Sequence, residues 1–280
     1  MWSLERKPHI LDFYIRRIFR IYPLAIASIL VLVVLHIPTM QNINGDTYFQ
    51  MPGLKVFTAN ILLIQNVLGG SNVIGVLWTL PLEIQMYFLL PFLFFYPAEL
   101  RGLASPTPMT VTVVYARSAF PVDSNSFVVC IPYFLSGVIA YVLFGKVRPR
   151  LPALLMPPLV LLMLCGFMFR PSWRNGWWLT LLLGITIPLF RPIRMRWLAA
   201  SSHHLAKYSY GIYLIHPFCI TIGINVLHNY NLVVRISAIV LSMVVIVVPT
   251  YHFLEKPMIN LGARFAANLE RQYELSVPAG

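Results

Sequence analysis

Long apolar runs separated by short polar stretches dominate the hydrophobic pattern of this chain. A helix that spans a membrane needs roughly 20 mostly apolar residues, and the clear runs cover 21–38, 76–97, 127–145, 151–169, 208–228 and 232–253. Two weaker runs, 56–69 and 177–190, have 14 residues each and are either short spans or re-entrant pieces. The runs are too long for strands and lack the polar alternation of a membrane barrel. The pattern therefore predicts an all-α, polytopic membrane helix bundle.

The distribution of basic residues decides between the possible numbers of spans. With eight spans and the N-terminus inside, 15 of the 21 Lys and Arg residues fall in cytoplasmic parts and five in outward parts. Loops on the cytoplasmic side carry such an excess of positive charge. We therefore expect about eight transmembrane helices with both termini in the cytoplasm. We further expect one integral-membrane domain over 1–280, divided into a cytoplasmic basic lead (1–20), a membrane bundle (21–257) and a cytoplasmic tail (258–280).

Composition narrows the class of protein further. Of the 280 residues, 58% are hydrophobic and 11% are charged, whereas a soluble domain is about one quarter charged. A soluble enzyme and a disordered chain are thereby excluded. The net charge of +12 indicates membrane topology and contact with anionic lipid headgroups, not nucleic-acid binding. Three cysteines without a Cys-x-x-Cys spacing indicate neither a disulfide framework nor a metal site.

The first candidate cluster lies at the border of the first apolar run. Arg17 and Arg20 are three residues apart and share a helix face, while Arg16 follows Asp12 by four and can form an ion pair with it. Two neighbouring guanidinium groups bind phosphate oxygens well. The alternative is plain anchoring, with both side chains extended to the headgroup region.

A second cluster surrounds the acid that lies deepest in an apolar run. Glu83 stands well inside 76–97, and a charge at mid-bilayer costs roughly 2.5–3.5 kcal/mol on insertion scales, so that such residues are usually functional. Tyr87 is one turn further along and can hydrogen-bond to it. Glu83 is therefore a candidate for proton transfer. The alternative is a structural carboxylate paired with an arginine of a neighbouring helix.

Two further clusters lie in the last two apolar runs. Ser209, Tyr213 and His216 are spaced i, i+4 and i+7, which places them on one face of a helix. His216 could move protons, or it could make a packing hydrogen bond between membrane helices. Glu255 follows the last run and either pairs with a basic residue of the membrane border or has a functional role.

Taken together, these clusters resemble the acyltransferase 3 family of integral-membrane acyltransferases. The matching segments extend over almost the whole chain: FYIRRIFRIYP at 13–23, WTLPLEIQMYFLLP at 78–91, YSYGIYLIHP at 208–217 and FLEKP at 253–257. The resemblance implies an O-acyltransferase for groups other than amino-acyl groups. Its donor would be cytoplasmic acyl-CoA, used as co-substrate without a bound cofactor. The acceptor would be a hydroxyl of a surface sugar or a lipid-linked glycan at the bacterial inner membrane.

The same resemblance assigns roles to individual residues. The family's Arg-x-x-Arg motif falls on Arg17 and Arg20, which would meet the phosphates or the acyl end of the donor. Its Trp-Ser-Leu-x-x-Glu-x-x-x-Tyr segment falls on Trp78, Leu80, Glu83 and Tyr87, with Thr79 in place of Ser. Its Tyr-Leu-x-His segment falls on Tyr213, Leu214 and His216. This implies Glu83 and His216 as catalytic residues, with Trp78, Tyr87, Ser209, Tyr213 and Glu255 in support.

One departure from the family pattern concerns its catalytic histidine. Members have ten membrane helices, and the first carries an Arg-x10-His motif; this chain opens on what resembles the third, and none of its seven histidines follows an arginine by eleven residues. Three explanations are open: a truncated gene or misassigned start, an inactive remnant, or replacement by another histidine such as His216. The first two imply that the chain as written is weak or inactive. Alternatives from other classes are a transporter or flippase of glycans, and a scaffold for polysaccharide assembly.

Overall fold

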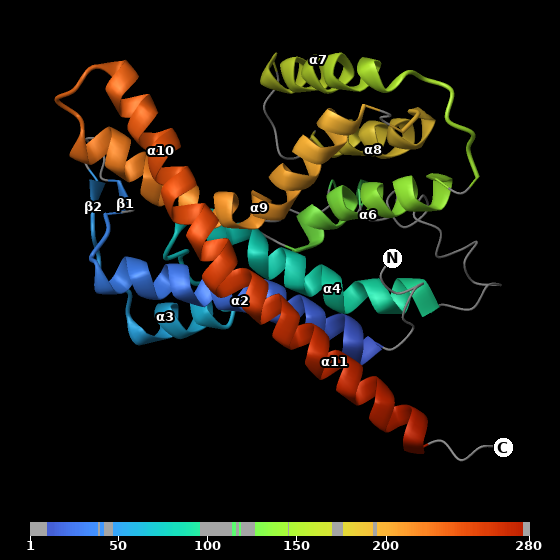
Figure 1. Cartoon of the computed structure of the whole chain (residues 1–280), viewed down its shortest axis with the longest axis horizontal. Coiled ribbons are helices and arrows are strands. Elements are labelled where there is room, and N and C mark those ends of the chain that lie inside the picture. The colour runs from blue at the N-terminus through green and yellow to red at the C-terminus, as the bar shows by residue number, and fades with distance from the viewer. Residues whose placement is uncertain are drawn as a thin grey trace. The chain divides into compact units, whose positions relative to one another are not determined.

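Two compact units make up the chain in the computed structural model (Figure 1), one formed by residues 82–199 and the other by 3–81 together with 200–280. The residues that the structure describes are 10–38, 40–41, 47–95, 114–115, 118, 127–144, 146–169, 176–192 and 195–276. The predicted basic lead before residue 10, most of the predicted loop 98–126 and the last four residues lie outside them.

Helices account for almost all of the described structure. The α-helices are α2 (Ile10–Val34), α3 (Leu54–Ile61), α4 (Thr79–Phe95), α6 (Phe127–Phe144), α7 (Met156–Phe169), α8 (Trp177–Thr186), α9 (Arg196–Thr221), α10 (Leu232–Thr250) and α11 (Lys256–Ser276). Short 3-10 helices precede α4 (η1, Gly75–Trp78) and α7 (η2, Ala153–Leu155) and follow α8 (η3, Ile187–Leu189), while π-helical turns follow α9 (η4, Ile222–Val226) and α10 (η5, Tyr251–Glu255). Each of the eight predicted apolar runs overlaps one of these helices, which confirms the all-α membrane bundle.

The only strands among the described residues are two antiparallel pieces of two residues each. β1 (Met40–Gln41) pairs with β2 (Thr47–Tyr48), with Met40 opposite Tyr48 and Gln41 opposite Thr47. They lie in the connection between α2 and α3, so they do not change the fold class.

Helix length separates clear spans from shorter pieces. In the described part of the chain, three continuous helical segments are long and apolar enough to cross a membrane: Ile10–Val34, Arg196–Val226 and Leu232–Gln272. By contrast, α3 has 8 residues, about 12 Å of helix against a hydrocarbon core of about 30 Å. For the first weak run the structure thus fits a re-entrant piece better than a complete span.

Two helices begin well before the apolar runs that predicted them, and a third lies beyond the last run. α2 begins at Ile10 instead of residue 21, α9 begins at Arg196 instead of 208, and α11 occupies most of the segment predicted as a tail. The added segments are polar or amphipathic, and hydropathy detects contact with lipid, not helical backbone. The added segments of α2 (10–20) and α9 (196–207) contain no proline, the residue least compatible with a helix interior. The proline of α11, Pro257, stands at the second position of its helix, where proline is tolerated.

In the unit 82–199, α6 and α8 lie side by side, with α7 next to α8 (Figure 1). Met86 of α4 packs with the α6 residues Ile131, Leu135 and Val138 in a buried cluster. Helices α6 and α8 approach closely at Gly184 of α8, where an added Cβ would lie 2.3 Å from the carbonyl oxygen of Ser136. Small residues permit such close approach of membrane helices.

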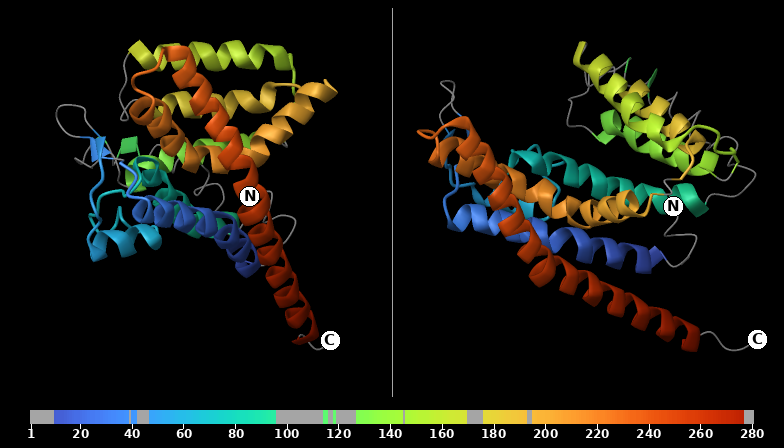
Figure 2. Two further views of the ribbon diagram at one scale, coloured as in Figure 1. Left: turned by 60° about the vertical axis from the view of Figure 1, so that its left-hand side comes forward. Right: turned by 45° about the horizontal axis from the view of Figure 1, so that its top comes forward.

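In the second unit, α11 runs along α2 (Figure 2). Gly262 provides the space, since a Cβ there would lie 2.5 Å from the Cβ of Phe19, and the rings of Phe19 and Phe265 are 5.7 Å apart. A separate cluster joins Ile215 and Cys219 of α9 to Val247 of α10. The predicted tail is therefore a packed helix in this structure.

Buried amides shape the segment between α3 and α4 in the same unit. Asn60 is fully buried; its Nδ2 donates to the carbonyls of Val56 and Ser71, and its Oδ1 accepts from the Val73 amide at 3.0 Å. Gln65 donates to the Leu77 carbonyl at 3.2 Å. Because these bonds satisfy loop backbone inside the unit, they hold η1 in place before Trp78 and Thr79.

Candidate functional site

The two predicted donor-binding arginines lie in the first half of α2. Their neighbour Arg16 forms the predicted ion pair with buried Asp12, with Nε at 2.9 Å and 3.0 Å from the carboxylate oxygens. The guanidinium of Arg17 lies 5.5 Å from the ring centre of Phe13, within cation–π range, and Arg20 is exposed. Arg16 is thus held by Asp12, as the spacing predicted, and Arg20 presents its charge to the surface.

Glu255 is the most enclosed acidic group among the predicted site residues. Its residue is 4% exposed, and its Oε1 has no hydrogen-bond partner within the described part of the chain. Gly211 of α9 lies against it, because a Cβ at residue 211 would be 2.9 Å from Oε1. Arg20 acts on it electrostatically, although no ion pair within contact distance joins them. The predicted pairing with a basic border residue is therefore an attraction at longer range.

The π-helical turn that carries Glu255 also brings together a cluster that the sequence did not single out. The Lys207 ammonium lies 4.7 Å from the ring centre of Tyr208 and 4.6 Å from that of Tyr251, and it donates to the Tyr208 hydroxyl at 3.2 Å. The hydroxyl is 3.4 Å from Nε2 of His252. Two aromatic faces thus hold one cation. The sequence shows Tyr208 next to Lys207 and could have indicated their contact. It does not show that Tyr251, from another segment, packs on the same lysine.

Tyr213 connects α9 to the turn before α4. Its hydroxyl donates to the carbonyl of Val76 and lies 2.6 Å from Oγ1 of Thr79. A phenol has a single proton, so Thr79 is the donor of the second bond. The family position occupied here by Thr79 thus retains a hydroxyl in contact with the predicted tyrosine.

His216 lies one turn beyond Tyr213 on α9 and is half-buried. Its Nδ1 is 2.8 Å from the Tyr213 carbonyl oxygen. Because a carbonyl only accepts, Nδ1 carries the proton and Nε2 of the neutral ring has the free lone pair. Ser209, the third residue of the predicted face, is exposed and donates to the Ala206 carbonyl at 2.9 Å. The ring of His216 is therefore oriented as a base, while Ser209 is bonded within its own helix.

A second tyrosine fixes α9 on its other side and was missed at the sequence level. The Tyr210 hydroxyl donates to the Ile21 carbonyl of α2 at 2.6 Å. Tyrosine is common at membrane interfaces, so residue type alone did not distinguish Tyr210 from the neighbouring tyrosines. Together with Tyr213, it joins α9 to two other segments of its unit.

Glu83 and Tyr87 lie on α4 in the part of that helix that belongs to the unit 82–199. Tyr87 donates to the Glu83 carboxylate, as the one-turn spacing predicted. Glu83 is half-buried, and Trp78, also half-buried, ends η1 five residues earlier. The acid is thus hydrogen-bonded to its predicted tyrosine within one helix.

Within the described part of the chain, no three His, Cys, Asp or Glu residues are grouped closely enough to hold a metal ion. The arrangement offers instead a cationic patch on α2, a buried carboxylate, and an imidazole whose Nε2 is available. Such a set can bind an anionic group and transfer a proton.

Comparison with known proteins supports an acyl-transfer family. No curated protein and no solved structure matches the chain. A family model, described as an acyltransferase domain, matches residues 1–252 and thus includes every site residue discussed above except Glu255. Since the match covers most of the 280 residues and the helices are those of a membrane protein, the chain belongs to the acyltransferase 3 family of membrane acyltransferases.

Proposed function

We propose that this protein transfers an acetyl or other short acyl group from cytoplasmic acyl-CoA to a hydroxyl of a surface sugar or lipid-linked glycan. It would do so in the bacterial inner membrane, with both termini in the cytoplasm. The family match supports acyl transfer, and the excess of basic residues in alternate loops supports this orientation. The observation that carries the proposal is the orientation of His216.

His216 would act as the general base. The proton of the acceptor hydroxyl moves to Nε2, and the acceptor oxygen attacks the thioester carbonyl carbon. The carbon–sulfur bond breaks, and the imidazolium returns the proton to the departing CoA thiolate, so that the products are an ester and free CoA. General acid–base catalysis of this kind contributes about 10²–10⁴-fold to the rate. The bond from Nδ1 to the Tyr213 carbonyl supports this role, because it holds the ring and its tautomer.

Arg17 and Arg20 would bind the phosphates of CoA. Their spacing on α2 aims both guanidinium groups to the same side of the helix, and Arg20 is exposed. The ion pair of Arg16 with Asp12 leaves the phosphates to the other two arginines. Glu83, hydrogen-bonded by Tyr87, would be the second group that exchanges protons along the reaction path.

The test uses a strain whose own copy of the gene is deleted and which is complemented with variants. We expect His216→Gln to lower glycan acylation about 100-fold or more, measured by mass spectrometry of the isolated glycan. His228→Gln is a matched control, because Nδ1 of His228 bonds to the Asn225 carbonyl at 2.9 Å in the same i−3 arrangement but at an exposed position. Unchanged acylation in His216→Gln at equal protein level would refute the assignment.

Two further variants separate donor binding from chemistry. Arg17→Ala should raise the KM for acyl-CoA more than it lowers kcat, whereas Glu83→Gln should lower kcat; exposed Lys55→Ala is the charge-loss control for the first. Loss of glycan export with acylation intact would favour the transporter or flippase. If the protein transfers no acyl group and polysaccharide assembly is nevertheless lost in its absence, the scaffold would be favoured.

A further inference from the structure

A large apolar cavity lies within the unit 82–199, and none of its lining residues is a site residue assigned above. Its volume is about 990 Å³, at the upper end of the roughly 300–1,000 Å³ found for small-molecule pockets. Aliphatic side chains and prolines form nearly all of its wall, and Arg191 is the only charged residue among the described lining residues. These are Pro149, Pro152, Ala153, Leu154, Met156, Pro157, Val160, Leu161, Leu164, Arg191, Pro192, Met195 and Leu198.

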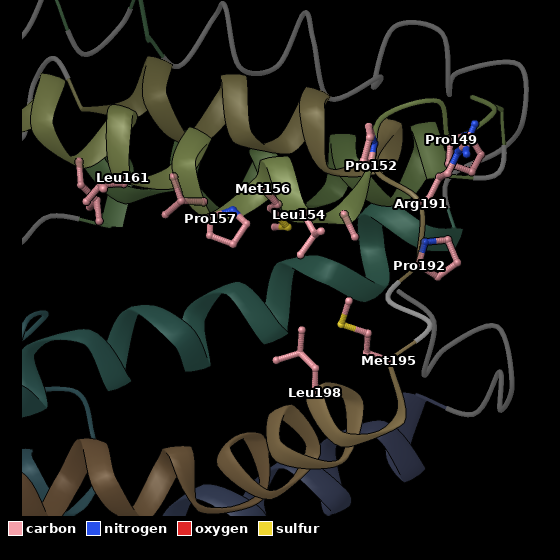
Figure 3. Close-up of a pocket in the computed structure, with 13 residues that line it drawn as sticks. Pro149, Pro152, Leu154, Met156, Pro157, Leu161, Arg191, Pro192, Met195 and Leu198 are labelled. Carbon is pink, nitrogen blue, oxygen red and sulfur yellow. The ribbon is translucent and has the colours of Figure 1, made fainter.

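The polar and apolar parts of this cavity are at opposite ends. Figure 3 shows Arg191 beside Pro149, Pro152 and Pro192 at one end, and Leu161 at the other. From Met156 to Leu164 the lining follows α7 for eight residue steps, about 12 Å of helix. One leaflet of the hydrocarbon core is about 15 Å deep. The lining along α7 is therefore nearly as long as one leaflet is deep, and a charge lies at one end of the cavity.

Backbone bonds fix the charged end of the cavity. The segment before η2 and the segment after η3 are joined as a parallel bridge, in which the Arg150 and Leu151 amides donate to the Leu189 carbonyl at 2.8 Å and 2.9 Å. The Arg191 amide donates in return to the Leu151 carbonyl at 2.9 Å. Exposed Arg150 and Arg191 are thereby held in adjacent segments at the same end of α7 and α8.

We propose that this cavity is a binding site for an anionic bilayer phospholipid, with one acyl chain along α7 and the phosphate at Arg150 and Arg191. In a membrane an acyl chain leaves one apolar environment for another, so the cavity wall gives little preference between lipids. The preference must come from the headgroup, to which each nearby cation contributes. Between residues 82 and 199, the only described carboxylate is Glu83, which already accepts from Tyr87. This site is independent of the proposed acyl transfer.

The test measures lipid retention by the delipidated full chain in mild detergent, using native mass spectrometry. The probes are phosphatidylglycerol and phosphatidylcholine with identical acyl chains. Two cations near the headgroup predict a preference of about 30-fold for phosphatidylglycerol, which is about 2 kcal/mol at 1.36 kcal/mol per tenfold. Equal retention of the two lipids by the unmodified protein would overturn the proposal without any variant.

Variants locate the site. Arg150→Ala with Arg191→Ala should abolish the preference, whereas Arg264→Ala with Arg271→Ala removes the same charge from α11 and should leave it intact. Leu161→Trp should weaken the binding of both lipids, because the larger ring fills the end of the cavity that would hold the acyl chain. Leu161 is 62% exposed, so the fold can accept the ring. An equal effect of the two arginine pairs would overturn the site. Displacement of phosphatidylglycerol by substoichiometric undecaprenyl phosphate would overturn a bilayer phospholipid as its occupant.

Discussion

The substitution Gly184→Ala tests a close contact between α8 and α6. A Cβ at residue 184 would lie 2.3 Å from the Ser136 carbonyl oxygen and 3.0 Å from its carbonyl carbon, where ordinary contact begins near 3.4 Å. The two helices would therefore have to separate by about 1.1 Å at this point. Both neighbouring atoms belong to backbone, so no side chain can move aside. A displacement of 0.5–1 Å loses about a quarter to a half of the dispersion energy of each affected contact.

We expect Gly184→Ala to destabilise the unit 82–199 by about 1–3 kcal/mol, the usual range for inserting a methyl group into a packed interior. Gly137→Ala is the matched control in the neighbouring helix α6, where nothing lies within 4 Å of the added Cβ. Alanine is a better helix former than glycine by roughly 0.5–1 kcal/mol, so the control should be slightly stabilised.

The assay is thermal unfolding in a mild detergent, followed by the loss of monodisperse protein on size exclusion. At about 2–4 °C per kcal/mol for a chain of this order, Gly184→Ala should lower the Tm by about 2–12 °C, while Gly137→Ala should not lower it. If both variants raise the Tm, the higher helix propensity of alanine outweighs any steric clash at residue 184. The close approach of α8 to the Ser136 carbonyl of α6 would then be wrong.

Two further predictions concern the site. Tyr213→Phe removes both hydrogen bonds of the hydroxyl to Val76 and Thr79, each worth about 1 kcal/mol net, and should lower the Tm. Tyr230→Phe is the control, because Tyr230 is 60% exposed, and it should leave the Tm unchanged. Equal Tm values for the two variants would show that the Tyr213 hydroxyl does not hold α9. Gly211→Ala places a methyl group 2.9 Å from a carboxylate oxygen of Glu255, which can rotate away, so acyl transfer should fall while the Tm changes little. Gly166→Ala, with open space around its Cβ, is its control, and full activity in Gly211→Ala would exclude a role for the carboxylate position.

The hydrophobic pattern predicted where helices occur better than where they end. A run such as 127–145 coincides with α6 within one residue, because almost all of its residues are apolar and no described polar segment extends the helix. At the start of α2 the pattern failed, since the ion pair between Asp12 and Arg16 stabilises a helix that hydropathy counts as polar. The amphipathic helix α11 was missed for the same reason: its apolar face packs on α2, and its overall composition remains polar.

The candidate site was predictable within helices and not between them. The bonds from Tyr87 to Glu83 and from Arg16 to Asp12 follow from a spacing of four residues, which helix geometry fixes. The approach of Gly211 to Glu255 joins segments 44 residues apart. It depends on how α9 and the π-helical turn pack, and no local spacing encodes that contact.

The contacts of α9 show how the proposed base, His216, is held without a charged partner among the described residues. Tyr210 and Tyr213 donate to backbone carbonyls of two different segments, and Nδ1 of His216 donates to a third carbonyl on its own helix. Carbonyls of structured backbone do not change rotamer or protonation state, so they position a side chain more rigidly than another side chain could. In an apolar environment these bonds are also stronger than in water. A base positioned in this way loses little orientational freedom when an acceptor hydroxyl arrives, which is the condition under which proximity accelerates transfer.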